Sequence, residues 1–169
     1  ERNIAASYHM EVGNVEEDLK KSDVVIKETF YTQAQAHAML EPHTVNARLD
    51  YQDRLVIYSS TQTPIHVRRI LSQTLEIPLS RIRVIKPRVG GGFGGKQALH
   101  GEMLVCAVTL RTGMPSKMVY TRQEVFESSC SRHPMRFDIT LGATKDGILE
   151  SIDCKVLSDT GAYGEHALT

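Results

Sequence analysis

The sequence has no excess of charge of either sign. Its 169 residues contain 20 lysines and arginines against 20 aspartates and glutamates. A neutral chain has no overall electrostatic attraction to nucleic acid or to an anionic membrane, so we expect neither as a partner. It also lacks an apolar run long enough to cross a bilayer, which excludes a membrane-spanning class.

Cysteine is scarce. The three cysteines, Cys106, Cys130 and Cys154, are an odd and widely spaced set, which does not build a disulfide framework. Without a CxxC pair, neither a zinc site nor a cysteine-bound cluster is expected in this chain. Unpaired cysteines are typical of a reducing compartment, so we expect a cytoplasmic protein. Residues 1–4 show neither a signal-peptide pattern nor a starting Met, which suggests a fragment of a longer protein.

Strands are predicted at intervals along the chain. Residues 1–21 are polar and acidic, and we expect a linker or a peripheral segment there, such as an edge strand. Alternating runs on either side of a turn at residues 50–53 predict a hairpin, and Asp146-Gly147 predicts the turn of another. The expected strands are residues 24–31, 44–49, 54–58, 82–85, 117–121, 136–141 and 148–157.

Three helices are expected between these strands. Thr63-Pro64 is a favourable start, with Thr63 as the N-cap, for a helix ending near Leu75. Residues 103–110 are apolar nearly all round, which predicts a buried helix, and residues 123–128 predict a short one. The expected fold class is therefore α+β, or mixed α/β, with β-hairpins plus β-α-loop-α units.

A glycine-rich loop, residues 90–96 with the sequence Gly-Gly-Gly-Phe-Gly-Gly-Lys, lies between a predicted strand and a predicted helix. Glycine permits positive φ and lets the backbone approach a ligand closely. Successive N–H groups and a following helix N-terminus favour an anion, and Lys96 would add a positive charge. The loop is therefore predicted to bind a phosphate or an oxyanion, with a tightly bent connector as the alternative.

The loop also matches the dinucleotide fingerprint Gly90-x-Gly92-x-x-Gly95 formally. Residues 86–88, Lys-Pro-Arg, stand where the preceding buried strand would be apolar. Phe93 is bulky for this turn, and the strand that follows ends in Arg122 rather than in an acid for a ribose. A dinucleotide-dependent reductase therefore stays an alternative and is not the preferred interpretation.

Four segments together resemble the molybdenum hydroxylases, the family of xanthine dehydrogenases and aldehyde oxidases. The glycine loop resembles the pterin-binding loop of that family. Residues 35–42 match its Q-x-H-x-x-x-E-P segment, residues 60–64 its S-T-Q-x-P turn, and residues 159–163 its D-x-G-A-Y segment. The resemblance implies that residues 22–169 are the incomplete, N-terminal part of a larger molybdenum-cofactor-binding domain.

The resemblance assigns cofactor contacts to five residues. Gln62 would lie beside the molybdenum and donate a hydrogen bond to its oxo ligand, which a carboxamide does without adding charge. The backbone of Gly91, Gly92, Phe93 and Gly94 would contact the pterin and an oxygen ligand of the metal, Phe93 through its N–H. Gln62 and Phe93 are thus also the candidate contacts of the metal site. From the residues alone, a turn glutamine and a core phenylalanine are the alternatives.

Gln97 is the candidate substrate-binding residue. Well-known xanthine dehydrogenases have glutamate at this position, and glutamine keeps the hydrogen bonds while losing the charge. A polar heterocycle therefore stays a plausible substrate. His37 and Glu41 are too few ligands for a metal, and a structural role is favoured for their segment. Arg122 and Arg132 are further candidates for contacts to the cofactor's phosphates, although most such arginines are solvated or paired.

The resemblance implies a molybdenum-dependent oxidoreductase that hydroxylates a purine or another N-heterocycle. Electrons would leave through iron–sulfur clusters to FAD on partner subunits or domains. The general base and a substrate-orienting arginine would lie beyond Thr169, so we expect no catalytic residue in this segment and no activity from the isolated chain. An aldehyde oxidoreductase of the same family and a non-catalytic phosphate-binding module are the alternatives.

Overall fold

The computed structural model describes residues 3–161 and divides the chain into two compact units. Unit 1 contains residues 1–35 and 132–169, and unit 2 contains residues 36–131. The chain therefore leaves unit 1, builds unit 2 and returns to complete unit 1. The expected limits of the larger domain, residues 22–169, stay a prediction.

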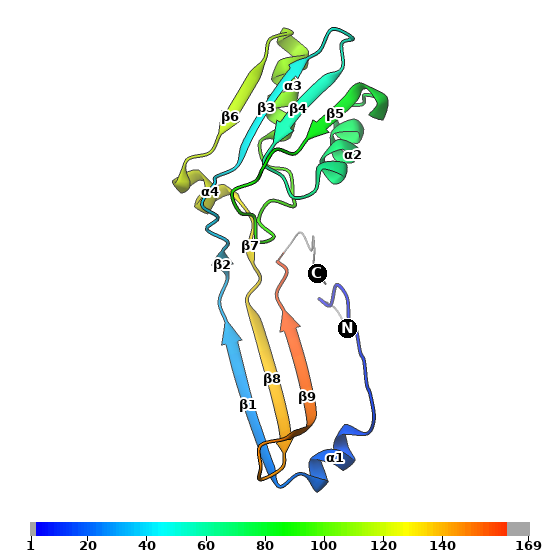
Figure 1. Ribbon diagram of the computed structural model, residues 1–169, viewed down its shortest axis with the longest axis vertical. Helices are drawn as coiled ribbons and strands as arrows, with labels where there is room; N and C mark the ends of the chain where they lie inside the picture. The colour runs from blue at the N-terminus through cyan, green and yellow to red at the C-terminus, as the bar shows by residue number, and fades with distance from the viewer. Residues whose placement is uncertain (1–2, 162–169) are drawn as a thin grey trace. The chain divides into compact units, whose positions relative to one another are not determined.

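Unit 1 has one helix and a three-stranded antiparallel sheet of order β1-β8-β9 (Figure 1). Its elements are α1 (Val15–Lys21), β1 (Val24–Thr32), β8 (Met135–Ala143) and β9 (Leu149–Ser158). Of the two alternatives expected for residues 1–21, a linker or a peripheral strand, the described residues 3–21 form no strand, and the segment ends in helix α1. Asn14 caps the helix by accepting a hydrogen bond from the Glu17 N–H, and acidic residues fill the first turn.

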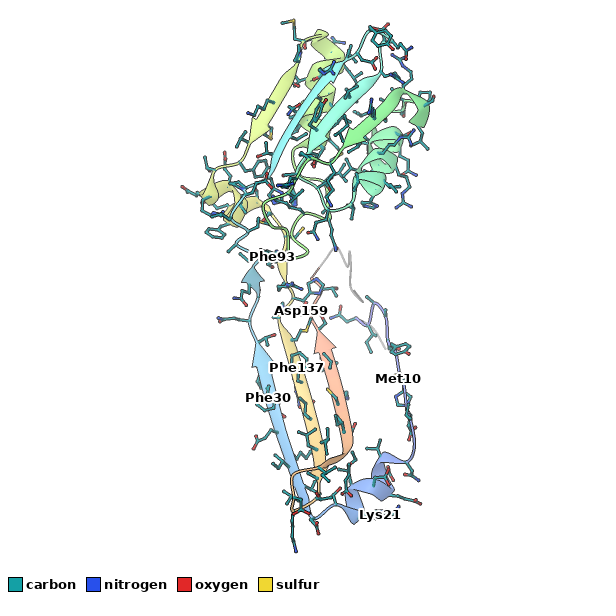
Figure 2. All side chains as sticks on the ribbon, in the orientation of Figure 1. Met10, Lys21, Phe30, Phe93, Phe137 and Asp159 are labelled. Carbon is teal, nitrogen blue, oxygen red and sulfur yellow. The ribbon has the colours of Figure 1, made fainter. Side chains whose placement is uncertain are left out.

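The register of this sheet places most of its apolar side chains on one face. Residues directly opposite each other share a face, as Phe30 of β1 and Phe137 of β8 do (Figure 2). The predicted hairpin β8–β9 is confirmed, with the Gly147 N–H donating to the Thr144 carbonyl at 3.0 Å. The pairing of β1 with β8, more than a hundred residues away, was not expected from the sequence.

Unit 2 is built on a four-stranded sheet of order β5-β4-β3-β6 (Figure 1). The predicted hairpin β3–β4 is confirmed, β6 pairs antiparallel with β3, and β5 runs parallel to β4. The elements are β3 (Thr44–Leu49), β4 (Leu55–Ser59), α2 (Pro64–Thr74), η1 (Leu79–Arg81), β5 (Ile82–Ile85), α3 (Glu102–Thr112), β6 (Ser116–Val119) and α4 (Arg122–Ser128). Two short strands, β2 (Gln35–Ala36) and β7 (Ser131–Arg132), lie where the chain passes between the units. The mixed α/β fold class is thus confirmed.

The core of unit 2 lies between this sheet and two helices. Ala47 and Ile57 face the same side of the sheet and are buried against Leu71 of α2 and Cys106 of α3. The expectation that α3 is buried all round is only half met. Its outer face is apolar yet open within the described residues, with Leu104 60% and Val108 51% exposed.

A pair of histidines lies at the end of this core. His43 is only 7% exposed, and its ring centroid lies 4.0 Å from that of His100 and 5.5 Å from that of Tyr120. Burial, followed by the positive charges of His100, Lys96 and His37, lowers the pKa of His43 to about 4. Between pH 6.5 and about 4, His43 is therefore mostly protonated in the unfolded chain and mostly neutral in the folded protein.

We predict that His43 makes the protein less stable in weak acid. The unfolded chain binds this proton near pH 6.5 and the folded chain only near pH 4, so stability falls as the pH drops through that window. At pH 5 the loss is about 2 kcal/mol. Urea unfolding at pH 7.5 and at pH 5 measures this loss of unfolding free energy. In His43→Phe the loss between the two pH values should be smaller than in the wild type by about 2 kcal/mol. Equal losses in both proteins, or a similar effect of the exposed-site control His9→Phe, would contradict the assignment.

Candidate functional site

The glycine loop follows β5, but it does not lead directly into a helix. Helix α3 begins only at Glu102, with Gly101 as its N-cap. The first turn of α3 is occupied by the Glu102 carboxylate itself, which accepts hydrogen bonds from the Ser59 hydroxyl at 2.6 Å and the His100 N–H at 2.8 Å. The expectation that the loop leads directly into a helix N-terminus is therefore corrected, because the loop ends at Lys96 and α3 begins only at Glu102, with an acidic residue in its first turn.

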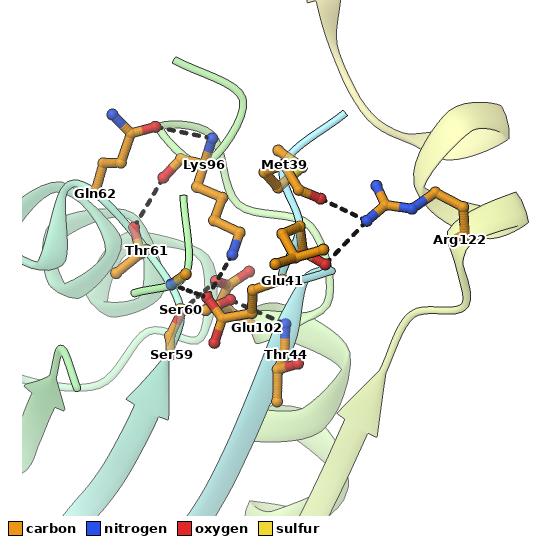
Figure 3. Close-up of polar contacts among 12 residues, drawn as sticks. Met39, Glu41, Thr44, Ser59, Ser60, Thr61, Gln62, Lys96, Glu102 and Arg122 are labelled. Carbon is orange, nitrogen blue, oxygen red and sulfur yellow. Dashed lines mark hydrogen bonds and ion pairs between the residues drawn. The ribbon is translucent and has the colours of Figure 1, made fainter. Parts of the chain in front are cut away.

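Lys96 does not offer its charge to a ligand either. The side chain is 1% exposed, and its ammonium lies 2.7 Å from Oε2 of Glu41 (Figure 3). Burial by itself would raise the pKa of Glu41, but hydrogen bonds from Lys96 and from the Gly90 N–H hold it below its usual value. The ion pair neutralises Lys96 inside the protein, which corrects the expectation that this lysine adds positive charge to the site.

Gln62 is hydrogen-bonded to the loop at three points. Its side-chain Oε1 accepts from the backbone N–H of Lys96 at 3.2 Å (Figure 3) and of Gly94 at 3.0 Å. The backbone N–H of Gln62 donates to the Lys96 carbonyl at 2.8 Å. Two donors on one oxygen fix which end of the carboxamide faces the loop. The remaining group, the Nε2 amide, is a pure donor that can serve a ligand.

The density of glycine in the loop has a steric cause. A Cβ on Gly92 would lie 2.5 Å from Gln62 Oε1, and one on Gly95 would lie 2.7 Å from the Met39 side chain. Gly91 and Gly94 have φ values of 96° and 93°, which other residues rarely adopt. The loop is thus a tightly packed turn, closed by a hydrogen bond of 2.8 Å from the Gly95 N–H to the Gly92 carbonyl.

Phe93 stands at the tip of this turn. Its φ of 53° is uncommon for a residue with a side chain, and the ring is 62% exposed (Figure 2). The alternative of a core phenylalanine is therefore wrong for the described chain.

Backbone donors of the loop divide into two groups. The N–H groups of Gly90, Gly94, Gly95 and Lys96 are bound within the protein. Those of Gly91 and Gly92 have no hydrogen-bond partner within residues 3–161. Together with Nε2 of Gln62, they form a set of neutral donors, which fits the oxygen and nitrogen acceptors of a pterin and of a metal's oxygen ligands.

Gln97 lies next to Gln62 because Thr63 joins the two segments. The Thr63 hydroxyl donates to the Gln97 carbonyl at 2.8 Å. Thr63 precedes α2 as expected, but its side chain makes no capping hydrogen bond, since the hydroxyl is used for this contact instead. The structure therefore brings Gln62, residues 91–94 and Gln97 together in unit 2.

Other candidates have different places. Arg122 donates to the carbonyls of Met39 and Leu40 and lies over the Phe126 ring, so it braces the chain beside the loop. Arg132 lies in unit 1, as does Asp159, the start of the expected D-x-G-A-Y segment. Ala162 and Tyr163 of that segment lie outside the described residues.

The segment of residues 35–42 contributes more than expected. Glu41 binds the loop, and the His37 ring lies close to the loop glycines, 2.8 Å from the place of a Cβ on Gly95. The only sequence signal for these contacts was the resemblance of that segment to a family motif. Among the residues described, no three His, Cys, Asp or Glu side chains are arranged to hold a metal ion. No helix of residues 3–161 is long and apolar enough to cross a membrane.

Comparison with solved structures supports the fold. An aldehyde oxidoreductase from Desulfovibrio gigas superposes with a TM-score of 0.78 at 24% identity, over 90% of this chain and 17% of that one. The quinoline 2-oxidoreductase of Pseudomonas putida 86 superposes with a TM-score of 0.74 at 28% identity, over 89% of this chain and 19% of that one.

Sequence comparison identifies relatives of higher identity than the solved structures. A probable hypoxanthine oxidase of Escherichia coli O157:H7 is 39% identical over 99% of this chain, which spans 18% of that protein. The large molybdopterin subunit of a nicotinate dehydrogenase from Eubacterium barkeri is 36% identical over 97% of this chain, which spans 39% of it. The family model of the molybdopterin cofactor-binding domain matches all residues from 1 to 169. This chain therefore belongs to the molybdopterin cofactor-binding domain family of the xanthine dehydrogenases and aldehyde oxidases.

Proposed function

We propose that this chain is part of a molybdenum hydroxylase acting on a purine or another N-heterocycle, and that Gln62 and the glycine loop hold one side of its cofactor. The observation that carries the proposal is the orientation of the Gln62 carboxamide. Two loop N–H groups occupy its oxygen, so the Nε2 donor is left for an acceptor on the cofactor. When bound, the molybdenum cofactor supplies the redox chemistry, and the protein supplies binding and orientation.

Each proposed contact follows from a group that the fold leaves available. Nε2 of Gln62 donates to an oxygen ligand of the metal, and the N–H groups of Gly91 and Gly92 donate to acceptors of the cofactor. The backbone of Phe93, at the tip of the turn, and that of Gly94 line the same side. These donors carry no formal charge, so they orient the cofactor without adding a cation beside it.

The charges around the loop disfavour the rival functions. A dinucleotide or a free phosphate would be bound by a lysine and a helix N-terminus. Here Glu41 neutralises Lys96, and Glu102 occupies the first turn of α3. A reductase using a dinucleotide therefore lacks a helix that begins directly after the glycines, and a module that binds only phosphate lacks a free lysine charge, because Lys96 is paired with Glu41.

Gln97 is the proposed contact to the substrate. The Thr63 hydroxyl donates to the Gln97 carbonyl, which holds the backbone of Gln97 beside the glycine loop. Two relatives named for a heterocycle, the hypoxanthine oxidase and the nicotinate dehydrogenase, support a heterocyclic substrate. An aldehyde substrate is the second candidate, because an aldehyde oxidase of Macaca fascicularis is 35% identical over 90% of this chain.

The partners follow from the same proposal. Iron–sulfur clusters and FAD on partner subunits or domains of a cytoplasmic complex would supply the path for electrons from the substrate. Because this chain spans only 18% to 39% of the two relatives described above, we propose that the general base and further substrate contacts lie in the rest of the protein. The isolated chain is accordingly expected to turn over no substrate.

We predict that the protein containing this chain binds molybdopterin and that Gln62→Glu weakens this binding. The new carboxylate still accepts from Gly94 and Lys96, but it replaces the Nε2 donor by a negative charge facing the cofactor. We expect at least about a tenfold loss of bound molybdenum, measured by elemental analysis together with pterin fluorescence. Gln73→Glu, on the exposed side of α2, is the matched control and should retain the wild-type content.

Two results would sink this prediction. A wild-type protein that lacks molybdenum and pterin but binds NAD tightly would support the reductase instead. A Gln62→Glu variant with the full cofactor content would show that the carboxamide does not contact the cofactor.

Gln97→Ala is predicted to weaken substrate binding without loss of cofactor. Removing one hydrogen bond to a heterocycle should raise KM about tenfold, while molybdenum content stays at the wild-type level. Steady-state kinetics with hypoxanthine, nicotinate and an aromatic aldehyde would measure the change. An unchanged KM for all three would place the substrate away from Gln97.

A further inference from the structure

Both ends of the glycine loop meet at one carboxylate oxygen. Oε2 of Glu41 accepts from the backbone N–H of Gly90 at 2.8 Å and from the ammonium of Lys96 at 2.7 Å. The backbone N–H of Glu41 also donates to the Gly90 carbonyl at 3.1 Å. The first and the last residue of the loop are thus tied to a single side chain from a distant part of the sequence.

This contact is closely packed. A Cβ on Gly90 would lie 2.7 Å from the Cβ of Glu41, so the two segments pack too closely for a side chain at position 90. Lys96 is almost wholly buried, and a buried ammonium is tolerated only with a partner. Glu41 therefore anchors Lys96, and removing it would leave an unpaired charge in the protein.

Lys96 in turn connects this contact to the ligand-facing groups. Its backbone N–H donates to Gln62 Oε1, and its carbonyl accepts from the Gln62 N–H. Moving Lys96 would therefore move the acceptor contact that orients the Gln62 carboxamide. Releasing Gly90 would also free the start of the segment that presents the N–H groups of Gly91 and Gly92.

We propose that Glu41 is a positioning residue of the cofactor site, which closes the loop of residues 90–96 through Gly90 and Lys96 and thereby aims the donors of Gln62, Gly91 and Gly92. This inference rests on the proposed function for the identity of the ligand. It assigns Glu41 a role that the sequence pattern left as merely structural. The hydrogen bonds of the Glu41 carboxylate go to Gly90 and Lys96, so the proposed role is exerted through these neighbours.

The test compares Glu41→Gln, Lys96→Met and the double variant in the whole cofactor-loaded enzyme, with Glu76→Gln as an exposed carboxylate control in the same unit. Hydrogen exchange of a peptide covering residues 89–97 reports on the loop, and that of residues 44–59 reports on the sheet. The rate of molybdenum loss on gel filtration reports on the site, as do kcat and KM measured separately.

We expect Glu41→Gln to speed exchange in residues 89–97 by about tenfold or more, with residues 44–59 unchanged, because a charge-assisted contact to the loop is lost. Molybdenum should be lost about tenfold faster, and kcat should fall more than KM rises. The double variant should retain molybdenum better than Glu41→Gln, since it leaves no unpaired buried charge. Glu76→Gln should match the wild type throughout.

Exchange that rises equally in residues 89–97 and 44–59 would overturn the proposal, because it would show a general loss of stability. Wild-type exchange and molybdenum retention in Glu41→Gln would overturn it as well. If Glu41→Gln does not fold, the double variant is compared with the wild type instead. We then expect hydrogen exchange to increase less in residues 44–59 than in residues 89–97. A wild-type enzyme without molybdopterin would instead contradict the proposed function, while the exchange comparison would still decide whether Glu41 holds the loop.

Discussion

The hydrogen bonds between the Gln62 carboxamide oxygen and the glycine loop are the interaction on which the site depends. They join two segments more than thirty residues apart, and the same two hydrogen bonds hold both the loop backbone and the Gln62 amide in place. A carboxamide suits this task because its two ends differ: its oxygen accepts from the loop, and its nitrogen keeps a donor that the loop does not use. The glycine at position 92 follows from the same contact, since any side chain there would collide with that oxygen.

The sheet of unit 2 makes this contact possible. The chain passes from β4 through residues 60–63 into α2, while β5, parallel to β4, leads into the loop. Parallel neighbours deliver their following segments to the same edge of a sheet, so Gln62 and the loop meet beyond the carboxyl ends of β4 and β5. Buried residues of α2 and α3 hold those strands in place, which makes the position of Gln62 a consequence of core packing.

The charged side chains beside the loop are paired within the protein. Glu41 neutralises Lys96, Glu102 occupies the start of α3, and the fold disfavours a proton on His43. The site itself is left with neutral donors. In the proposed function, this set would contact acceptors of the cofactor without adding a charge beside it.

The sequence by itself determined the local elements and the family. Turn residues and alternation predicted both hairpins, Thr63-Pro64 predicted the start of α2, and the glycine loop with residues 60–64 identified the molybdopterin-binding family. Only the tertiary structure decided the roles of Lys96, Glu41 and Thr63. A lysine beside glycines and a threonine before a helix have local explanations, as an anion ligand and a cap. Their actual partners are far away in the chain, and local pattern carries no information on which distant groups packing brings within hydrogen-bond distance.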